Sequence, residues 1–315
     1  MARAFQGRQR PSRLRAGTLV TQRQTWLCAG MHIILGATGH IGSTLSQLLL
    51  ERGEPVTVVT RDPHQRETWE RKGARVAVLD ITDVDALRGV FETGKRAYVL
   101  NPPAPPASDT VAVERKTASA LLSALAGSGL ERVVAQSTYG AQPGAALGDL
   151  GVLCELERGL EQLSLPFTII RGAYYMSNWD TALATARSES RVHTLLPAHF
   201  KLPMVAPQDI ARVAAELLTE PLRSQRLQYV EGPARYSAGD VAGALSEALG
   251  KQVEVATVPP ARWLEALQNM GFSAAAAESM AAMTRVTLSE DYELPNQPTR
   301  GSTTLMAYIQ RLVRP

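Results

Sequence analysis

The chain has 315 residues, of which 45% are hydrophobic, and a formal net charge of +3 at pH 7. This length suits one large α/β domain or a nucleotide-binding domain with a smaller partner, and the lack of a long apolar run argues against a membrane span. The two cysteines, Cys28 and Cys154, exclude a disulfide framework and favour a reducing, cytoplasmic setting.

Positive charge is concentrated in the first thirty residues, which contain six arginines and no acidic residue. Removing those six charges from the net +3 leaves −3 for residues 31–315, so the folded body does not favour nucleic-acid binding. Residues 1–30 could be an extension upstream of a natural start at Met31, an organelle transit peptide or a basic arm. We favour the first, because Met31 directly precedes the first predicted strand, and we expect residues 1–30 to be disordered.

In chain order, the first predicted strand (residues 31–35) leads into the most informative stretch of the chain. Glycines follow at positions 36, 39 and 42, and an amphipathic helix follows at residues 44–52. Gly36 allows a sharp turn, Gly39 allows backbone N–H groups to approach a pyrophosphate, and Gly42 allows helix and strand to pack closely. The helix N-terminus adds partial positive charge. This order predicts a dinucleotide-binding loop.

The second strand (residues 55–60) ends beside Arg61, where an NAD-specific site would place an acidic residue for the ribose hydroxyls. A guanidinium suits a 2′-phosphate, so we predict NADP(H) as the cofactor and NAD(H) less strongly. The alternative is a surface arginine paired with Asp62.

Strands and helices then alternate regularly up to residue 171. Strands are predicted at residues 75–79, 97–100, 132–136 and 167–170, and helices at 62–72, 84–91, 110–128 and 150–163. A proline cluster at 102–106 predicts a stiff loop. The alternation predicts a doubly wound, parallel α/β sheet in a nucleotide-binding domain of residues 31–171.

Beyond residue 171 the alternation loosens, and we predict a smaller α+β lobe of residues 172–315, some of whose strands and helices return to the core. Helices are predicted at 207–218, 237–249, 261–270, 274–284 and 303–313, and strands at 228–230 and 253–258. We expect this lobe to lie over the carboxyl ends of the strands, where substrates bind in such sheets.

Several short motifs resemble those of the NmrA-like branch of the atypical short-chain dehydrogenases/reductases. They are residues 36–42 (GATGHIG), 60–63 (TRDP), 80–83 (DITD), 137–138 (ST), 167–171 (FTIIR), 175–178 (YMSN), 209–211 (DIA) and 231–233 (EGP). The resemblance implies a Rossmann domain with a small C-terminal lobe. It also implies an NAD(P)H-dependent reductase, for example of quinones, or a regulator that binds NADP without turning it over.

The resemblance further implies roles for individual residues along the cofactor. The pyrophosphate loop would comprise Gly36, Thr38, Gly39, His40, Ile41 and Gly42, with Arg61 at the 2′-phosphate and Asp80 and Ile81 at the adenine. The nicotinamide ribose and ring would be bordered by Asn101, Pro102, Pro103, Ser137, Thr138 and Tyr139. Alternatively, Asp80 could cap a turn, Asn101 could hold the proline loop, and Tyr139 could only pack.

One departure from the superfamily concerns proton transfer. Classical members pair a tyrosine with a lysine four residues later, and the helix after Ser137 has no such pair. Its nearest counterpart is Cys154 with Arg158, and we favour a thiol that is simply packed in the helix. We therefore predict no catalytic residue, and the five histidines show no spacing that predicts a metal site.

An aromatic cluster follows the last strand of the predicted domain. Tyr174, Tyr175, Asn178 and Trp179 could line a flat, apolar acceptor pocket or pack between the lobes. The favoured function is an NADPH-dependent oxidoreductase that passes hydride to a planar, small-molecule acceptor such as a quinone, which takes its protons from water. The alternatives are an NADP(H) sensor without catalysis and, more weakly, DNA binding through the arginine-rich segment. The oligomeric state is left open, with a homodimer as one option.

Overall fold

The first half of the chain alternates strands and helices as predicted. The computed structural model describes residues 30–221 and 226–314, so nearly all of the arginine-rich segment and Cys28 lie outside the described residues. The elements are β1 (His32–Ile34), α2 (His40–Glu51), β2 (Val56–Thr60), α3 (Gln65–Arg71), β3 (Arg75–Val78), α4 (Val84–Glu92), β4 (Arg96–Val99), α5 (Thr110–Leu125), β5 (Arg132–Thr138), α6 (Asp149–Glu161) and β6 (Phe167–Gly172).

The second half contributes shorter and less regular elements. They are β7 (Tyr174–Tyr175), the 3₁₀ turn η1 (Met176–Trp179), α7 (Ala182–Glu189), β8 (Arg191–Thr194), β9 (Leu202–Val205), α8 (Pro207–Thr219), β10 (Leu227–Glu231), β11 (Arg235–Tyr236), α9 (Ala238–Leu249), β12 (Glu254–Thr257), the 3₁₀ turn η2 (Pro260–Arg262), α10 (Trp263–Asn269), α11 (Ala274–Ser289), β13 (Thr299–Arg300) and α12 (Leu305–Val313).

A parallel sheet of eight strands forms the centre of the molecule, in the order β13-β10-β6-β5-β4-β1-β2-β3. Chain order reverses between β1 and β4, which is the switch point where ligands bind in open α/β sheets. The predicted Rossmann-type α/β fold is confirmed. The division at residue 171 stays a prediction, since β10, β13 and α8 from the second half complete this sheet and its cover.

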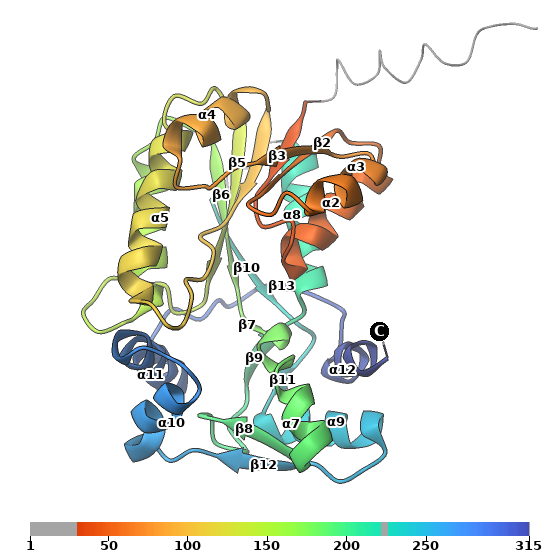
Figure 1. Ribbon diagram of the computed structural model, residues 1–315, viewed down its shortest axis with the longest axis vertical. Helices are drawn as coiled ribbons and strands as arrows, with labels where there is room; N and C mark the ends of the chain where they lie inside the picture. Colours follow the sequence, from red (N-terminus) through yellow and green to blue (C-terminus); the bar gives the residue numbers. More distant parts are fainter. Residues whose placement is uncertain (1–29, 222–225, 315) are drawn as a thin grey trace, which may run out of the picture.

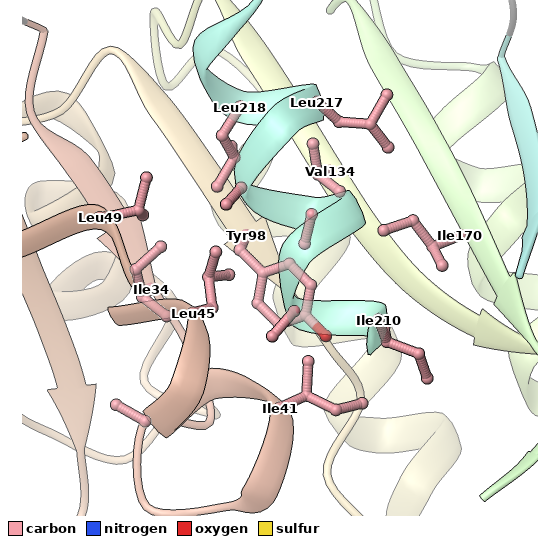
Figure 2. Packing of buried hydrophobic residues seen from close by; sticks show 14 of the residues in the cluster. Ile34, Ile41, Leu45, Leu49, Tyr98, Val134, Ile170, Ile210, Leu217 and Leu218 are labelled. Atoms are coloured by element: carbon pink, nitrogen blue, oxygen red, sulfur yellow. The ribbon is translucent and has the colours of Figure 1, made fainter. Parts of the chain in front are cut away.

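Helices cover both faces of the sheet, with α2, α3 and α8 on one face and α4, α5 and α6 on the other (Figure 1). Alternate residues of the buried strands enter the two cores, as the two-residue period of a strand requires. In β4, for example, Tyr98 enters the core beneath α2 and α8, whereas Ala97 and Val99 enter the opposite one. Figure 2 shows Tyr98 between the residues of α2 and α8, among them Leu45 and Ile210.

The smaller lobe has its own core, formed mainly by α7, α9, α12 and the strands β8 and β9. Two small sheets (β11-β9-β7 and β12-β8) lie in this lobe, and α10 and α11 lie between it and the end of α5 (Figure 1). No secondary structure was predicted for residues 174–205, because strands of two to four residues are too short to show a period. Within residues 30–221 and 226–314, no helix is long and apolar enough to cross a membrane.

Candidate functional site

The glycine turn between β1 and α2 has a conformation that side chains would prevent. Gly36 has φ +70°, and the N–H of Gly39 donates to its carbonyl oxygen at 2.9 Å. A Cβ on Gly42 would lie 2.3 Å from that same oxygen, so helix and turn could not approach as they do. A Cβ on Gly39 would meet only the Gly36 oxygen at 3.4 Å, so the outer surface of the turn is open to a ligand. Gly36 and Gly42 are thus required by the turn and by its close approach to the helix, and the pyrophosphate role of Gly39 stays a prediction.

The first turn of α2 presents backbone donors at this surface. Gly39 is the N-cap, and within the described part of the chain no side chain caps this helix end. Thr38 and His40 are exposed beside it, whereas the Ile41 side chain packs into the core, so that only its backbone can serve a ligand. His40 Nε2 lies 3.3 Å from Asp180 Oδ2, a contact that links the turn to the smaller lobe.

Arg61 lies exposed at the end of β2, at the same edge of the sheet as the glycine turn. Its guanidinium has no hydrogen-bond or ion-pair partner among residues 30–221 and 226–314, and Asp62 instead accepts from the His64 N–H at 2.9 Å. Asp80 accepts from the Thr82 N–H and hydroxyl, both at 2.8 Å, and so caps a turn. The Thr82 N–H, with a smaller contribution from Arg61, lowers the pKa of Asp80. Ile81 beside it is half-buried.

The loop after β4 is held by α5. The Asn101 side chain donates to the Glu114 carbonyl oxygen at 3.1 Å, and the Glu114 carboxylate accepts from the Ala104 N–H at 3.0 Å. Pro102 is half-buried and Pro103 is exposed in this loop. Asn101 therefore holds the proline loop, and its place beside the nicotinamide ribose stays a prediction.

Ser137, at the end of β5, belongs to a buried polar network. Its hydroxyl donates to Glu157 Oε1 at 2.5 Å, and Arg171 donates to both Glu157 oxygens at 3.0 and 2.6 Å. Arg171 also donates to the Tyr229 hydroxyl at 2.9 Å. Ser137 is 3% exposed, and this network holds its side chain in place. Sequence reasoning missed the network.

A cavity of about 610 Å³ opens next to the end of β5, between α6, η1, α7, α10 and α11. Tyr174, Asn178 and Trp179, the candidates for an acceptor pocket, line it. Thr138 and Tyr139, which were expected beside the nicotinamide ring, line it as well. Its apolar lining from α10, α11 and the turn between them was not predicted and comprises Ala266, Leu267, Met270, Phe272, Met280, Met283 and Val286. A cavity of this size suits a drug-sized ligand, and methionines adapt to irregular shapes.

Tyr175 does not line this cavity, in contrast to the prediction. Its side chain packs against the core beneath α2 and α8, and its hydroxyl accepts from the Gln136 side chain at 2.9 Å. Because successive residues of β7 point to opposite sides, Tyr174 and Tyr175 cannot both face the cavity. The Tyr139 hydroxyl is also engaged, since it donates to Glu231 Oε1 at 3.0 Å. Burial, reinforced by Glu231, raises the pKa of Tyr139 well above its usual range.

Helix α6 presents Asp149 and Leu153 to the cavity, and Glu157 follows one turn later on the same face. Leu153 makes the middle of this wall apolar. Cys154 is buried and lies outside the cavity lining, and burial raises the pKa of its thiol, so the favoured interpretation of Cys154 as a packed residue agrees with its position. Among the described residues, no group of three or more His, Cys, Asp or Glu side chains could hold a metal ion.

Comparison with known proteins places these features in a family. An NAD(P)H azoreductase of Xenophilus azovorans is 25% identical over 250 residues, which cover 79% of this chain and 85% of that protein. The triphenylmethane reductase of Citrobacter sp. has the same fold, with a TM-score of 0.74 at 17% identity over 90% of this chain and 99% of that one. An NADPH-dependent quinone oxidoreductase of Escherichia coli, solved with NADPH, has a TM-score of 0.69 at 20% identity over the same shares of the two chains. The model of the NmrA-like family matches residues 31–305, and the chain therefore belongs to the NmrA-like family.

Proposed function

We propose that this protein is an NADPH-dependent reductase that passes hydride to a bulky, planar, electron-poor acceptor such as a quinone. The observation that carries the proposal is an open glycine turn after β1 and an apolar cavity beside the end of β5, which the His40–Asp180 contact links at one edge of the sheet. The relatives are named for NAD(P)H-dependent reduction of azo compounds, triphenylmethane dyes and quinones. All three names describe NAD(P)H-dependent reduction, which supports the reaction type. The acceptors differ among them, so the names do not identify the acceptor of this protein.

The residues present fit a phosphorylated dinucleotide. The glycine turn and the uncapped start of α2, near Gly39 and Gly42, would receive the pyrophosphate. Arg61, free of protein partners within the described residues, would bind the 2′-phosphate, and Asp80 and Ile81 would border the adenine. Asn101 and Pro102 would border the nicotinamide ribose, with Thr138 and Tyr139 beside the ring. When bound, the reduced nicotinamide supplies a hydride.

The chain's own contribution to the reaction is orientation and a dry cavity. Residues of α10 and α11 exclude water from the acceptor, and Tyr174 and Trp179 offer aromatic faces for stacking. No tyrosine–lysine pair is present, because α6 contains neither residue and places Leu153 on the cavity wall. This absence disfavours the usual reduction of a simple ketone, in which such a pair protonates the alkoxide.

Stopped-flow oxidation of NADPH against a panel of quinones, azo compounds and triarylmethane dyes tests the proposal. We expect hydride transfer to at least one bulky aromatic acceptor and none to small aliphatic ketones. Leu153→Asp places a charge on the apolar wall. It should raise the KM for the acceptor by a larger factor than the Kd for NADPH. Tight binding of NADP⁺ or NADPH without turnover of any acceptor would contradict the proposal and favour an NADP(H) sensor.

A further inference from the structure

The cavity wall contains one residue that neither the fold nor the proposed cofactor site explains. Asp149, the first residue of α6, is the acidic side chain among the described residues that line the cavity. It lies one helical turn before Leu153 on the same face of α6. Placing a charged carboxyl group in such apolar surroundings costs free energy unless a hydrogen bond or an ion pair compensates for the lost water.

The polar groups around Asp149 are incompletely satisfied. The hydroxyls of Thr110 in α5 and Ser279 in α11 face it, and these residues are only 7% and 4% exposed. Both hydroxyls favour the charged form of the Asp149 carboxyl group, although neither reaches it with full hydrogen-bond geometry. Of these three residues, Asp149 lines the cavity, whereas Thr110 and Ser279 lie outside its lining.

A second carboxyl group, that of Glu114, lies one helical turn after Thr110 in α5 and interacts electrostatically with Asp149. This side chain is buried, and one of its oxygens accepts from the Ala104 N–H at 3.0 Å. Burial raises the pKa of Glu114 to about 7, with a smaller contribution from the charge of Asp149. Burial also raises the pKa of Asp149, although the hydroxyls of Thr110 and Ser279 oppose this shift.

Among the described residues, neither carboxyl group of this pair forms an ion pair with a cation. Arg115, the next residue of α5, is bound to both carboxylate oxygens of Glu155 on the outer side of α6, at 2.8 and 3.0 Å. Asp109 at the start of α5 adds a further negative charge. Two neighbouring carboxyl groups without a cation tend to retain a proton between them, as in paired catalytic carboxylates.

We propose that Asp149 is the proton donor to the acceptor and that Glu114 restores its proton. This step rests on the proposed reductase function. As the acceptor takes up a hydride with its two electrons, the O–H bond of the Asp149 carboxyl group breaks and an O–H or N–H bond forms on the acceptor's heteroatom. Glu114 then passes its proton to the Asp149 carboxylate and recovers one from solvent. The pair would thus replace the missing tyrosine–lysine relay from a different position on α6.

Two kinds of acceptor separate this role from a structural one. Reduction of a quinone consumes a hydride and a proton, whereas a triarylmethane cation is neutralised by the hydride alone and needs no proton. In single-turnover reactions with saturating acceptor, Asp149→Asn should slow quinone reduction on the order of 10²-fold, the typical contribution of a general acid. Reduction of the cation should stay within about twofold of wild type, which also shows that the variant folds and binds NADPH.

Controls and a second variant complete the test. Glu155→Gln changes a carboxylate on the outer face of the same helix and should leave both rates unchanged. Glu114→Gln should remove the fall in the quinone rate that the wild type shows as pH rises above about 7. The wild type should also show a normal solvent isotope effect with the quinone that is lost in Asp149→Asn, a readout that does not depend on the dye.

The outcomes distinguish the two levels of the proposal. An unchanged quinone rate in Asp149→Asn, or an equal loss with both acceptors, would overturn the role of Asp149 while the wild type remained an active reductase. Failure of the wild type to oxidise NADPH with any acceptor would overturn the proposed function and the proton step together.

Discussion

Helix α6 carries two bidentate ion pairs of similar geometry and very different burial, which allows a matched test of what burial does to a charge pair. Glu157 binds Arg171 through two hydrogen bonds of 3.0 and 2.6 Å, with side chains 9% and 13% exposed. Glu155 binds Arg115 through two hydrogen bonds of 2.8 and 3.0 Å, with side chains 50% and 54% exposed. The substitutions Glu157→Gln and Glu155→Gln change the same atoms in both places.

The expected loss in the free energy of unfolding depends on the surroundings of the arginine whose carboxylate partner each substitution removes. Glu157→Gln leaves the buried Arg171 guanidinium with the exposed Glu293 carboxylate, at 3.5 Å, as its remaining ion-pair partner, and it also weakens the acceptor of the Ser137 hydroxyl. Breaking a buried pair typically costs about 3–5 kcal/mol, and the loss should lie near the lower end of this range. In Glu155→Gln, water solvates the freed guanidinium of Arg115, so the cost should be about 0.2–1 kcal/mol. The free energy of unfolding should therefore differ between the two variants by roughly 3 kcal/mol.

Urea denaturation followed by circular dichroism measures both values under the same conditions. The double variant Glu157→Gln with Arg171→Met removes the stranded charge and should recover at least half of the loss, because the cost of an isolated buried cation disappears. Equal losses in the two single variants, or no recovery in the double variant, would refute this reasoning.

Three further predictions concern the cofactor site and pH. Arg61→Asp should raise the Kd for NADPH about 10–100-fold, the value of a charge-assisted hydrogen bond, and change that for NADH only slightly, as calorimetry would show; an equal effect on both would mean that Arg61 does not bind the 2′-phosphate. Gly42→Ala should abolish cofactor binding measured by nicotinamide fluorescence, because its Cβ would lie 2.3 Å from the Gly36 oxygen, whereas Gly89→Ala, whose Cβ meets no atom within 4 Å, should bind normally. The pKa of Glu114 is raised from 4.5 to about 7, so the folded state holds a proton that the unfolded state releases, and wild-type stability falls as pH rises between these values. Glu114→Gln should remove this fall, which is roughly 3 kcal/mol at most; the same pH dependence in variant and wild type would contradict the assignment.

The fold and the glycine turn were predictable because they depend on local patterns. Alternating strands and helices need right-handed crossovers and produce a parallel sheet whatever the details of packing. The three glycines act within seven residues of each other, so their spacing alone indicated the turn. The short strands β7, β8 and β9 were missed, because pairing partners far away in the chain, and not a local period, stabilise them.

Individual roles were harder to predict wherever the partner is distant in sequence. Tyr175 was grouped with Tyr174 as a pocket residue, yet its hydroxyl is held by Gln136, 39 residues earlier. The sequence did not distinguish Glu157 from the other charged residues of its helix. Its burial depends on Arg171 and Ser137, which reach it from two neighbouring strands.

By itself the sequence determined the class of fold, the position of the glycine turn, the arginine at the end of the second strand and the lack of a tyrosine–lysine pair. These are properties of residue type and short-range spacing. Only the tertiary structure decided which side of α6 faces the cavity, because that depends on how α10 and α11 pack against it. It thereby placed Leu153 and Asp149 on the wall and Cys154 away from it, and it brought the buried Glu114 within electrostatic range of Asp149. Burial and proximity between distant segments, which no local pattern encodes, thus identified the carboxyl groups that could move a proton.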